Sequence, residues 1–545
     1  MNLGMLLFAV CFSGTMAVFS NELSWLVDPL VRVERPADPA AHPLSWQKLH
    51  DRTAEAFPQA VVLALYPPRG ERSVARALIA YSQTDWRWVS LNPYTVEIQG
   101  LSSGVNLSNV LRVFHKQFYV VPSNLWIHGV LIVGALGLAL FMAAVTGLVS
   151  LTRWWRSFVL LRSGRSARLF WSDVHRLTGV WALLVTVILS LTGVWYLAEH
   201  LLDRAGLLAH DAPPAQLEMA ALKQRGPSLL PVDLDVAAAR AQAAFPELQI
   251  QQLSLPSQPN NLLTFSGKAD AWLVRTRANQ VQIDPYTGEV LRVVRGTDLD
   301  AADRWVESAD PLHFGTFAGV TSQLVWLVVG LVLCGGILAG LYGAWLRLAQ
   351  KTEIRRRSWL VTVLALAPTF AVLACSVYGA LSYSGKFLAT AQTPIDSWSL
   401  GNSEIGPWRL SVWRLNNARE STANVNLIFE GPARPNFDKL FLWVGDAESA
   451  LASRPVRRFR DRFIGPVALP PDGCADVCRL NVRIEDWAGT IHQVSIAMPS
   501  SAAGSAVVLP AARGLSIGDK SLIGIFVLLI LLPLAGWTWL QVRYR

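Results

Sequence analysis

The chain has 545 residues, of which 52% are hydrophobic and only 16% are charged, and its mean hydropathy is +0.33. An ordinary soluble domain carries about 25% charged residues, so these values exclude a purely cytosolic enzyme. They also exclude a disordered chain, which requires low hydrophobicity and high charge. Together with 22 tryptophans, they are typical of a membrane protein with folded domains outside the bilayer.

The net charge of +9 is unevenly placed along the sequence. Three short segments, 153–176, 346–358 and 542–545, together carry more positive net charge than the whole chain does. The rest of the chain is therefore slightly acidic. We therefore expect no basic face for DNA or RNA and no nucleic-acid partner. Basic segments of this kind flank membrane-spanning helices on their cytoplasmic side.

Six apolar segments approach or reach the roughly 20 residues that a helix needs to cross a bilayer. They lie at about 3–19, 127–150, 177–198, 322–346, 359–380 and 521–541. Alternating these spans places all three basic segments on one side, which the positive-inside rule assigns to the cytoplasm. The sequence therefore predicts cytoplasmic N- and C-termini and three large regions on the outer side of the membrane.

This topology divides the chain into spans, cytoplasmic loops and outward domains. The predicted boundaries are 1–26 for transmembrane helix one, 27–125 for the first outward domain, 126–152 for helix two, 153–176 for a basic loop, 177–198 for helix three, 199–320 for the second outward domain, 321–346 for helix four, 347–358 for another basic loop, 359–380 for helix five, 381–520 for the third outward domain and 521–545 for helix six with its tail. The third domain alternates short apolar runs with Gly, Pro and Asp turns, which predicts a β-rich fold.

The first two thirds of the chain contain an internal repeat. Ser13-Gly14 in the first span matches Thr192-Gly193 in the third, and an apolar helix candidate follows each, at 46–57 and at 234–245. Parallel repeats often build the functional interface of a membrane protein. The sequence therefore predicts two copies of one unit, each made of spans and an outward domain.

A turn and a histidine recur in both copies. The turns are Asn92-Pro93-Tyr94-Thr95 and Asp284-Pro285-Tyr286-Thr287, and each follows a predicted strand. Proline at the second turn position and an Asx side chain that bonds the backbone two residues on make this motif structural rather than catalytic. His115 and His313 come after the turns, shortly before the next span in each copy.

Three motifs in combination carry a resemblance to a known family. They are Trp171-Ser172-Asp173-Val174-His175-Arg176-Leu177-Thr178-Gly179-Val180-Trp181, Asp284-Pro285-Tyr286-Thr287-Gly288-Glu289-Val290 and Pro311-Leu312-His313. Over roughly residues 1–346 the sequence resembles the PepSY-associated transmembrane family of iron-regulated proteins, which includes bacterial inner-membrane siderophore-iron reductases. The resemblance implies about six membrane helices, periplasmic α+β PepSY domains and haem b at one or two sites. It also implies that electrons pass outward through the inner membrane to reduce ferric siderophore in the periplasm.

A haem held by two histidines needs neutral imidazoles on different helices that face each other across the porphyrin. His115 and His313 occupy corresponding repeat positions, so the family resemblance makes them the candidate ligands of an outer haem. Without the resemblance, each fits a histidine at the membrane interface. His128, about one turn into the second span, is an alternative to His115, because the stretch between them leaves the register open. His200, near the outer end of the third span, is a further alternative.

His175 opens the third span on the cytoplasmic side, where the resemblance makes it a candidate ligand of an inner haem. About 25 residues of helix separate it from His200, or roughly 37 Å, so those two cannot share one haem. The repeat places the counterpart of His175 before Met1. We expect either a start farther upstream or an inner haem that is lost or differently held; in the plainer interpretation, His175 simply extends the basic loop.

The third outward domain offers weaker candidates. Cys474 and Cys478 form a C-x3-C pair, for which a disulfide, two free thiols and, with His492, a metal site stay open. Arginines at 454–462 fit either a solvated face or a patch that attracts an anionic siderophore or lipid headgroups. Its tryptophans are expected in the core rather than on a ligand surface: Trp398, Trp408, Trp413, Trp443 and Trp487.

The sequence contains no dinucleotide-binding or P-loop motif, so a separate donor, a quinol or a cytosolic flavoprotein, would supply electrons. Two functions stay open. One is a haem-dependent ferric-siderophore reductase. The other is a non-redox membrane scaffold whose PepSY domains bind a periplasmic protein or peptide, and in which the histidines are merely interfacial.

Overall fold

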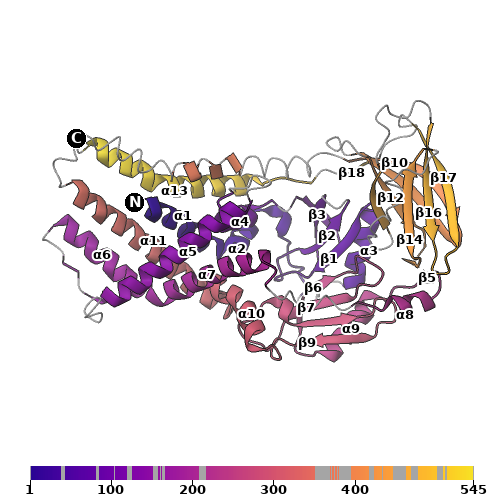
Figure 1. The fold of residues 1–545 in the computed structure, drawn as a ribbon, viewed down its shortest axis with the longest axis horizontal. Helices are drawn as coiled ribbons and strands as arrows, with labels where there is room; N and C mark the ends of the chain where they lie inside the picture. The colour runs from indigo at the N-terminus through magenta and orange to yellow at the C-terminus, as the bar shows by residue number, and fades with distance from the viewer. Residues whose placement is uncertain are drawn as a thin grey trace.

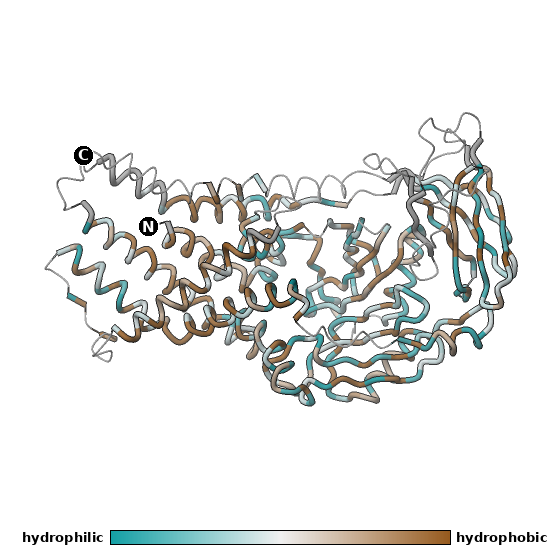
Figure 2. Tube along the Cα trace, in the orientation of Figure 1, coloured by the Kyte–Doolittle hydropathy of each residue, from teal (hydrophilic) through white to brown (hydrophobic). Residues whose placement is uncertain are grey.

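The structure is a computed structural model, and the helices and strands below belong to the residues that it describes. These residues are 2–38, 43, 45–81, 85–103, 105–119, 126–150, 158–159, 161–162, 166–207, 216–349, 369, 371–373, 375–376, 378–379, 395–416, 423–431, 434–445, 462–467, 477–499, 507–509 and 512–543. A helical bundle occupies one end of the molecule, sheets occupy the other, and Figure 1 shows both termini at the bundle. The bundle is the most uniformly hydrophobic part (Figure 2).

The two repeats share a core of one long helix, one packing helix, four strands and two further helices, to which each repeat adds other elements. The first contains α1 (Asn2–Ala17), α2 (Ser20–Val27), η1 (Pro29–Val31), α3 (Trp46–Ala56), β1 (Val61–Tyr66), β2 (Ala75–Ala80), β3 (Trp86–Leu91), β4 (Ile98–Ser102), α4 (Leu107–Gln117) and α5 (Trp126–Ser150). The second contains α6 (Ala167–Trp181), α7 (Leu183–Arg204), α8 (Met219–Gln224), β5 (Ser228–Leu229), α9 (Leu234–Ala244), β6 (Gln249–Ser254), β7 (Leu263–Lys268), η3 (Thr276–Ala278), β8 (Gln280–Ile283), β9 (Val290–Val294), α10 (Ala301–Phe314) and α11 (Gly319–Ala349).

Fewer spans are visible than the six that the sequence predicts. Three helical segments in the described residues are long and apolar enough to cross a membrane, Gly129–Ser150, Leu183–Arg204 and Gly319–Arg347. The pair α1 and α2, bent by 63°, makes a fourth if it is one broken span. The predicted span 359–380 lies mostly outside the described residues, and α13 (Ile517–Arg543) covers the predicted last span.

The third predicted span begins later than expected. Residues 177–181 belong to α6, which also carries the charged Arg168, Asp173 and Arg176, and the helix stops at Ala182 before α7 begins. The apolar window is therefore Leu183–Arg204 rather than 177–198. Arg162 and Arg176 both form ion pairs with the buried Asp173, which explains why this polar helix is tied to the basic loop rather than to lipid.

The outward domains of the two repeats share one antiparallel sheet of eight strands, in the order β4-β3-β2-β1-β6-β7-β8-β9. Helices α3 and α9 pack on it and close one hydrophobic core with Leu65, Ile79, Leu253 and Phe265. Strands β1 and β6 join the halves, and Leu65 pairs with Leu253. The predicted helix candidates 46–57 and 234–245 are confirmed as α3 and α9.

The halves are related by an approximate two-fold axis through this central pair of strands. Leu65 and Leu253 are 188 residues apart, and so are Trp46 and Leu234, the first residues of α3 and α9. Residue 65 therefore pairs with its own counterpart, as a two-fold axis requires. The membrane helices follow the same relation, because α5 packs on α7 and α1 packs on α11.

The third domain is β-rich, as predicted. Its strands are β10 (Ile395–Ile405), β11 (Trp408–Asn416), β12 (Ala423–Phe429), β13 (Arg434–Pro435), β14 (Lys439–Val444), β15 (Arg462–Val467), β16 (Val477–Glu485), β17 (Ile491–Pro499) and β18 (Val507–Leu509). A five-stranded sheet and a three-stranded sheet enclose one core between them. Trp408 and Trp443 are buried, whereas Trp398, Trp413 and Trp487 are partly buried. Cys474 and residues 454–461 lie outside the described part, so the disulfide and the arginine patch stay predictions.

The third domain is docked on the PepSY-like sheet at the end far from the membrane bundle (Figure 1). Strand β13 pairs with β5 of the second repeat. The buried Asn436 side chain donates from Nδ2 to the carbonyl oxygens of Leu222 and Gly226, both at 2.6 Å. Asn426 donates to the carbonyl of Gln59 in the first repeat at 2.7 Å. The third domain therefore contacts both halves.

Candidate functional site

Two histidines from different repeats meet where the bundle joins the sheet. His115 lies in the last turn of α4 and His313 in the last turn of α10, and the centroids of their rings are 5.9 Å apart with an angle of 45° between the ring planes. Each of these short helices directly precedes a long apolar helix, α5 or α11. The repeat therefore brings two equivalent residues together, as the sequence predicts for an outer site.

The Nδ1 atom of each ring is held by the span of its own repeat. Nδ1 of His115 lies 2.9 Å from the carbonyl oxygen of Val10 and 3.4 Å from Oγ of Ser13. Nδ1 of His313 lies 2.8 Å from Oγ1 of Thr192. Ser13 and Thr192 are the residues that the sequence repeat aligns, so the alignment corresponds to a shared structural role.

These contacts determine the tautomer of both rings. A carbonyl only accepts, so Nδ1 of His115 carries the proton that it donates to Val10. The hydroxyl of Thr192 donates to the carbonyl of Ile188 at 2.7 Å, so its oxygen accepts from Nδ1 of His313. Nε2 of each ring then has a lone pair, and no hydrogen bond in the described part of the chain occupies it.

The surroundings keep both imidazoles neutral. Desolvation by burial lowers the pKa of His115, and burial together with the neighbouring His115 lowers the pKa of His313 to about 3. Neutral imidazole with a free Nε2 is the form that binds a metal. Within the described residues, no group of three or more His, Cys, Asp or Glu side chains could hold a bare metal ion. The pair therefore offers two neutral nitrogen ligands.

A glycine makes room for the first ring. A Cβ atom on Gly14 would lie 2.6 Å from Cε1 of His115, closer than real side chains approach. On the opposite repeat, Gly193 faces Gly137, and a Cβ on Gly137 would lie 3.5 Å from the backbone of Gly193. The sequence repeat pairs Gly14 with Gly193. Both copies therefore have a glycine directly after the residue, Ser13 or Thr192, whose hydroxyl contacts Nδ1 of the histidine.

A second layer of polar residues holds His313. The ring of Tyr196 packs edge-on against it, with centroids 5.2 Å apart, and the Tyr196 hydroxyl donates to Asp310 at 2.5 Å. Asp310 lies one helical turn before His313 and forms an ion pair with Arg275 at 2.9 Å. Sequence analysis missed these residues, although the spacings Asp310 to His313 and Thr192 to Tyr196 place each pair on one helix face.

The family model described as the PepSY-associated TM region matches residues 2–347. The chain belongs to this family. The match covers the two repeats with their spans and ends before the β-rich third domain, in agreement with the resemblance expected over 1–346. No curated protein matches the chain.

His175 of this PepSY-family chain lies apart from the pair. His175 on α6 donates from Nδ1 to the carbonyl of Gly336 on α11 at 2.7 Å, and a Cβ on Gly340 would lie 2.8 Å from that nitrogen. In the described residues, no ring contact joins His175 to a second histidine. Gly336 is ten residues beyond Trp326, whose indole donates to the carbonyl of Leu312 beside His313. The His175 contact at Gly336 and the His313 contact near Trp326 are thus about 15 Å apart along α11.

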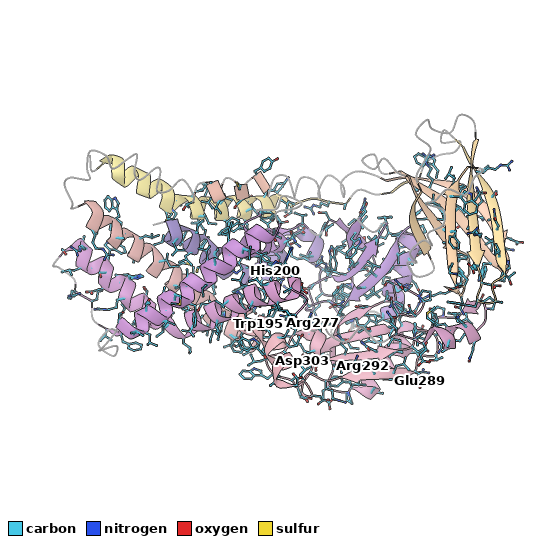
Figure 3. All side chains as sticks on the ribbon, in the orientation of Figure 1. Trp195, His200, Arg277, Glu289, Arg292 and Asp303 are labelled. Atoms are coloured by element: carbon cyan, nitrogen blue, oxygen red, sulfur yellow. The ribbon has the colours of Figure 1, made fainter. Side chains whose placement is uncertain are left out.

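The two alternative outer ligands fit less well. Figure 3 labels His200 and Trp195 along the outer half of α7. His200 is eight residues beyond Thr192, or about 12 Å along the helix, so it lies beyond the site of the histidine pair. The backbone of His128 belongs to the first turn of α5, and its side chain lies outside the described residues.

Proposed function

We propose that this PepSY-family protein is an oxidoreductase of the bacterial inner membrane that binds haem b through His115 and His313 and passes electrons outward to ferric siderophore. The pairing of the two rings at the junction of the repeats carries the proposal. A cytoplasmic location of both termini and a periplasmic location of the sheets belong to the same proposal, supported by the basic segments beside the spans.

The geometry of the pair fits a haem. A bond from a metal to an imidazole nitrogen is about 2 Å, so two imidazoles that shared one iron would have ring centroids about 6 Å apart. The observed separation of 5.9 Å agrees with this value. Haem supplies a reversible one-electron couple, and the macrocycle provides the other four iron ligands, so two histidines suffice.

The residues of the chain have defined tasks in this function. Val10 and Thr192 accept hydrogen bonds from Nδ1 and so would leave Nε2 of each ring to hold the iron, as partners of metal-bound histidines usually do. Tyr196 and Asp310 fix the His313 ring. Arg112, one turn before His115, has its guanidinium 5.7 Å from the centre of the Phe314 ring and places a positive charge beside the site for the carboxylates of the cofactor.

The proposed reaction is a one-electron transfer. Ferric iron in the siderophore would gain one electron and become ferrous iron, which the siderophore holds less tightly. A haem held by the two histidines would supply the one-electron couple, and a quinol or a cytosolic flavoprotein would be the source of the electron. The PepSY domains would hold the ferric siderophore near the outer site.

His175 is the proposed ligand of an inner haem. Its Nδ1 contact with Gly336 leaves Nε2 available, as at the outer pair. A second axial ligand would have to come from outside the described residues or from a molecule other than this chain. The inner site is thus a separate part of the proposal, and the haem count tests it.

The test is a dithionite-reduced minus oxidised visible spectrum of the purified protein, with haem counted per polypeptide. His115→Ala and His313→Ala should each remove the outer haem, whereas His50→Ala, on α3 of the first outward domain, should not. Two haems support the inner site, and one haem limits the function to the outer pair. A colourless protein, purified after expression with ample haem, would favour the non-redox scaffold.

A further inference from the structure

A loop of the second PepSY domain exposes a large aromatic side chain beside the membrane bundle. Trp272, between β7 and η3, is 59% exposed, although it belongs to a folded domain with a closed core. Its indole packs edge-on against Phe317, with ring centroids 6.1 Å apart. Phe317 in turn packs against Trp326 on α11, with centroids 5.2 Å apart. An unbroken aromatic path therefore links the exposed indole to a membrane helix.

The backbone of this loop fixes the position of Trp272. Leu273 has a left-handed conformation with φ of 57°, which is unusual for a residue with a side chain. The carbonyl of Trp272 accepts from Arg304 at 2.9 Å, and the carbonyl of Leu273 accepts from Ser308 at 2.7 Å. Both partners are on α10. The loop is therefore tied to this helix by its main chain, and the Trp272 side chain stays outside.

The level of Trp272 corresponds to the outer face of the bilayer. Helix α11 has 31 residues and is about 46 Å long, whereas the hydrocarbon layer is about 30 Å thick. Arg347 in its last turn belongs in one headgroup layer, so the roughly 20 residues that cross the hydrocarbon end near residue 325, and the first turns, which include Val320 and Leu324, reach the opposite headgroup layer. Phe317 precedes these turns directly and contacts Trp326 in the third turn, so Phe317 and Trp272 lie at the same level.

Neighbouring residues of α11 extend the same apolar surface. Its exposed side chains include Val320, Leu324, Val325 and Val328. On a helix of this length and composition, side chains of this kind face lipid. Trp272 is continuous with this lipid-facing surface through Phe317. Tryptophan has an apolar ring and one N–H donor, and it concentrates at the membrane–water interface.

We propose that the loop 269–275 of the second PepSY domain rests on the outer leaflet and that Trp272 inserts its indole among the lipid headgroups. The partner is the bilayer surface itself. Because the loop is bound to α10, this contact holds the helix that carries His313 at a fixed height above the membrane. The inference does not depend on whether haem is bound.

The test replaces Trp272 by the photoreactive p-benzoyl-phenylalanine in the full chain, reconstituted at one copy per lipid nanodisc. The same substitution at Val320 is the positive control, and at Leu230 the negative control. Leu230 is 64% exposed but adjoins β5, at the end of the molecule far from the bundle (Figure 1). After illumination, mass spectrometry counts lipid adducts on each polypeptide.

We expect position 272 to give lipid adducts at a yield comparable with position 320, while position 230 gives none above background. Adducts at 320 but none at 272 would overturn the proposal. So would cross-links from 272 to another part of the same chain, because these would mean that protein, not lipid, covers the indole. Gel filtration before illumination confirms that each variant is folded and monodisperse.

Discussion

At the residue scale, the site depends on small features that sequence patterns only partly reveal. The repeat and the family motifs point to His115 and His313, and the structure brings these rings together. Tyr196, Asp310 and Arg275 were not predictable as a group, because three segments distant in sequence meet only in the folded chain. The sequence leaves the choice between His115 and His128 open; the structure pairs His115 with His313, and the His128 side chain lies outside the described residues.

Gly14 is the residue whose replacement most directly tests the space around the His115 ring. We expect Gly14→Ala to displace the His115 ring, because the new Cβ would lie 2.6 Å from Cε1, and to abolish binding of the outer haem. Alanine otherwise favours a helix by about 1 kcal/mol over glycine, so a loss cannot come from helix propensity. Gly335→Ala on α11, where nothing lies within 4 Å, is the matched control. Equal haem content in both variants would contradict the claim that Gly14 makes room for the His115 ring.

A buried ion pair in the first PepSY domain tests its core independently of any cofactor. The Arg87 side chain is fully buried and makes two hydrogen bonds to Asp85, each 2.9 Å long. Removing one partner leaves a buried charge, which costs about 3 to 5 kcal/mol. Asp85→Ala should therefore lower the thermal unfolding midpoint strongly. Glu55→Ala, which breaks the exposed pair with Arg52, should change it little.

At the scale of elements, local chemistry was predictable and helix ends were not. In both Asx-Pro turns the side chain accepts from the backbone two residues on, at 2.9 Å for Asn92 and 2.8 Å for Asp284. Such turns depend on neighbouring residues alone, so the sequence reveals them. The break between α6 and α7 falls within an apolar run, and α6 packs against α11, a contact between distant segments that no local pattern encodes.

The Asp284 turn also predicts a dependence on pH. Burial alone would raise the pKa of Asp284, but hydrogen bonds from Arg225 and from the N–H groups of Tyr286 and Thr287 outweigh it and lower the pKa below the usual aspartate value. A lowered pKa in the folded state contributes stability above the ordinary pKa of aspartate, and this contribution is lost as pH falls through the lowered value.

We therefore expect Asp284→Asn to be less stable than the natural protein at neutral pH. The difference in stability should become smaller in acid, where the Asp284 carboxylate is protonated. Thermal unfolding of the full chain, followed across that range, measures the difference from the natural protein at each pH. Asp270→Asn, on an exposed loop of the same domain, serves as the control. A difference that stays constant with pH would show that the Asp284 charge is not what stabilises the turn.

At the scale of the whole molecule, the third domain is held by a few specific contacts. Asn436 satisfies two carbonyl groups of the second repeat and accepts from the indole of Trp487 at 2.9 Å. Asn436→Ala leaves these buried groups unsatisfied, at about 1 to 3 kcal/mol for each such group. We expect faster hydrogen exchange at 219–229 and at 434–436, whereas Asn402→Ala, on an exposed strand position, should change neither. Unchanged exchange in both variants would mean that other contacts suffice for docking.

The pairing of Leu65 with Leu253 bears on the origin of the molecule. A half-length ancestor forming a closed dimer would have built the same sheet from two identical chains and contributed one histidine from each to their shared axis. Duplication and fusion of such a unit would have freed the two histidine positions to diverge. In this chain the partners of Nδ1 differ, a main-chain carbonyl of Val10 on one side and the hydroxyl of Thr192 on the other. The two histidines thus have unlike surroundings, which the two copies in a strictly symmetric homodimer cannot have.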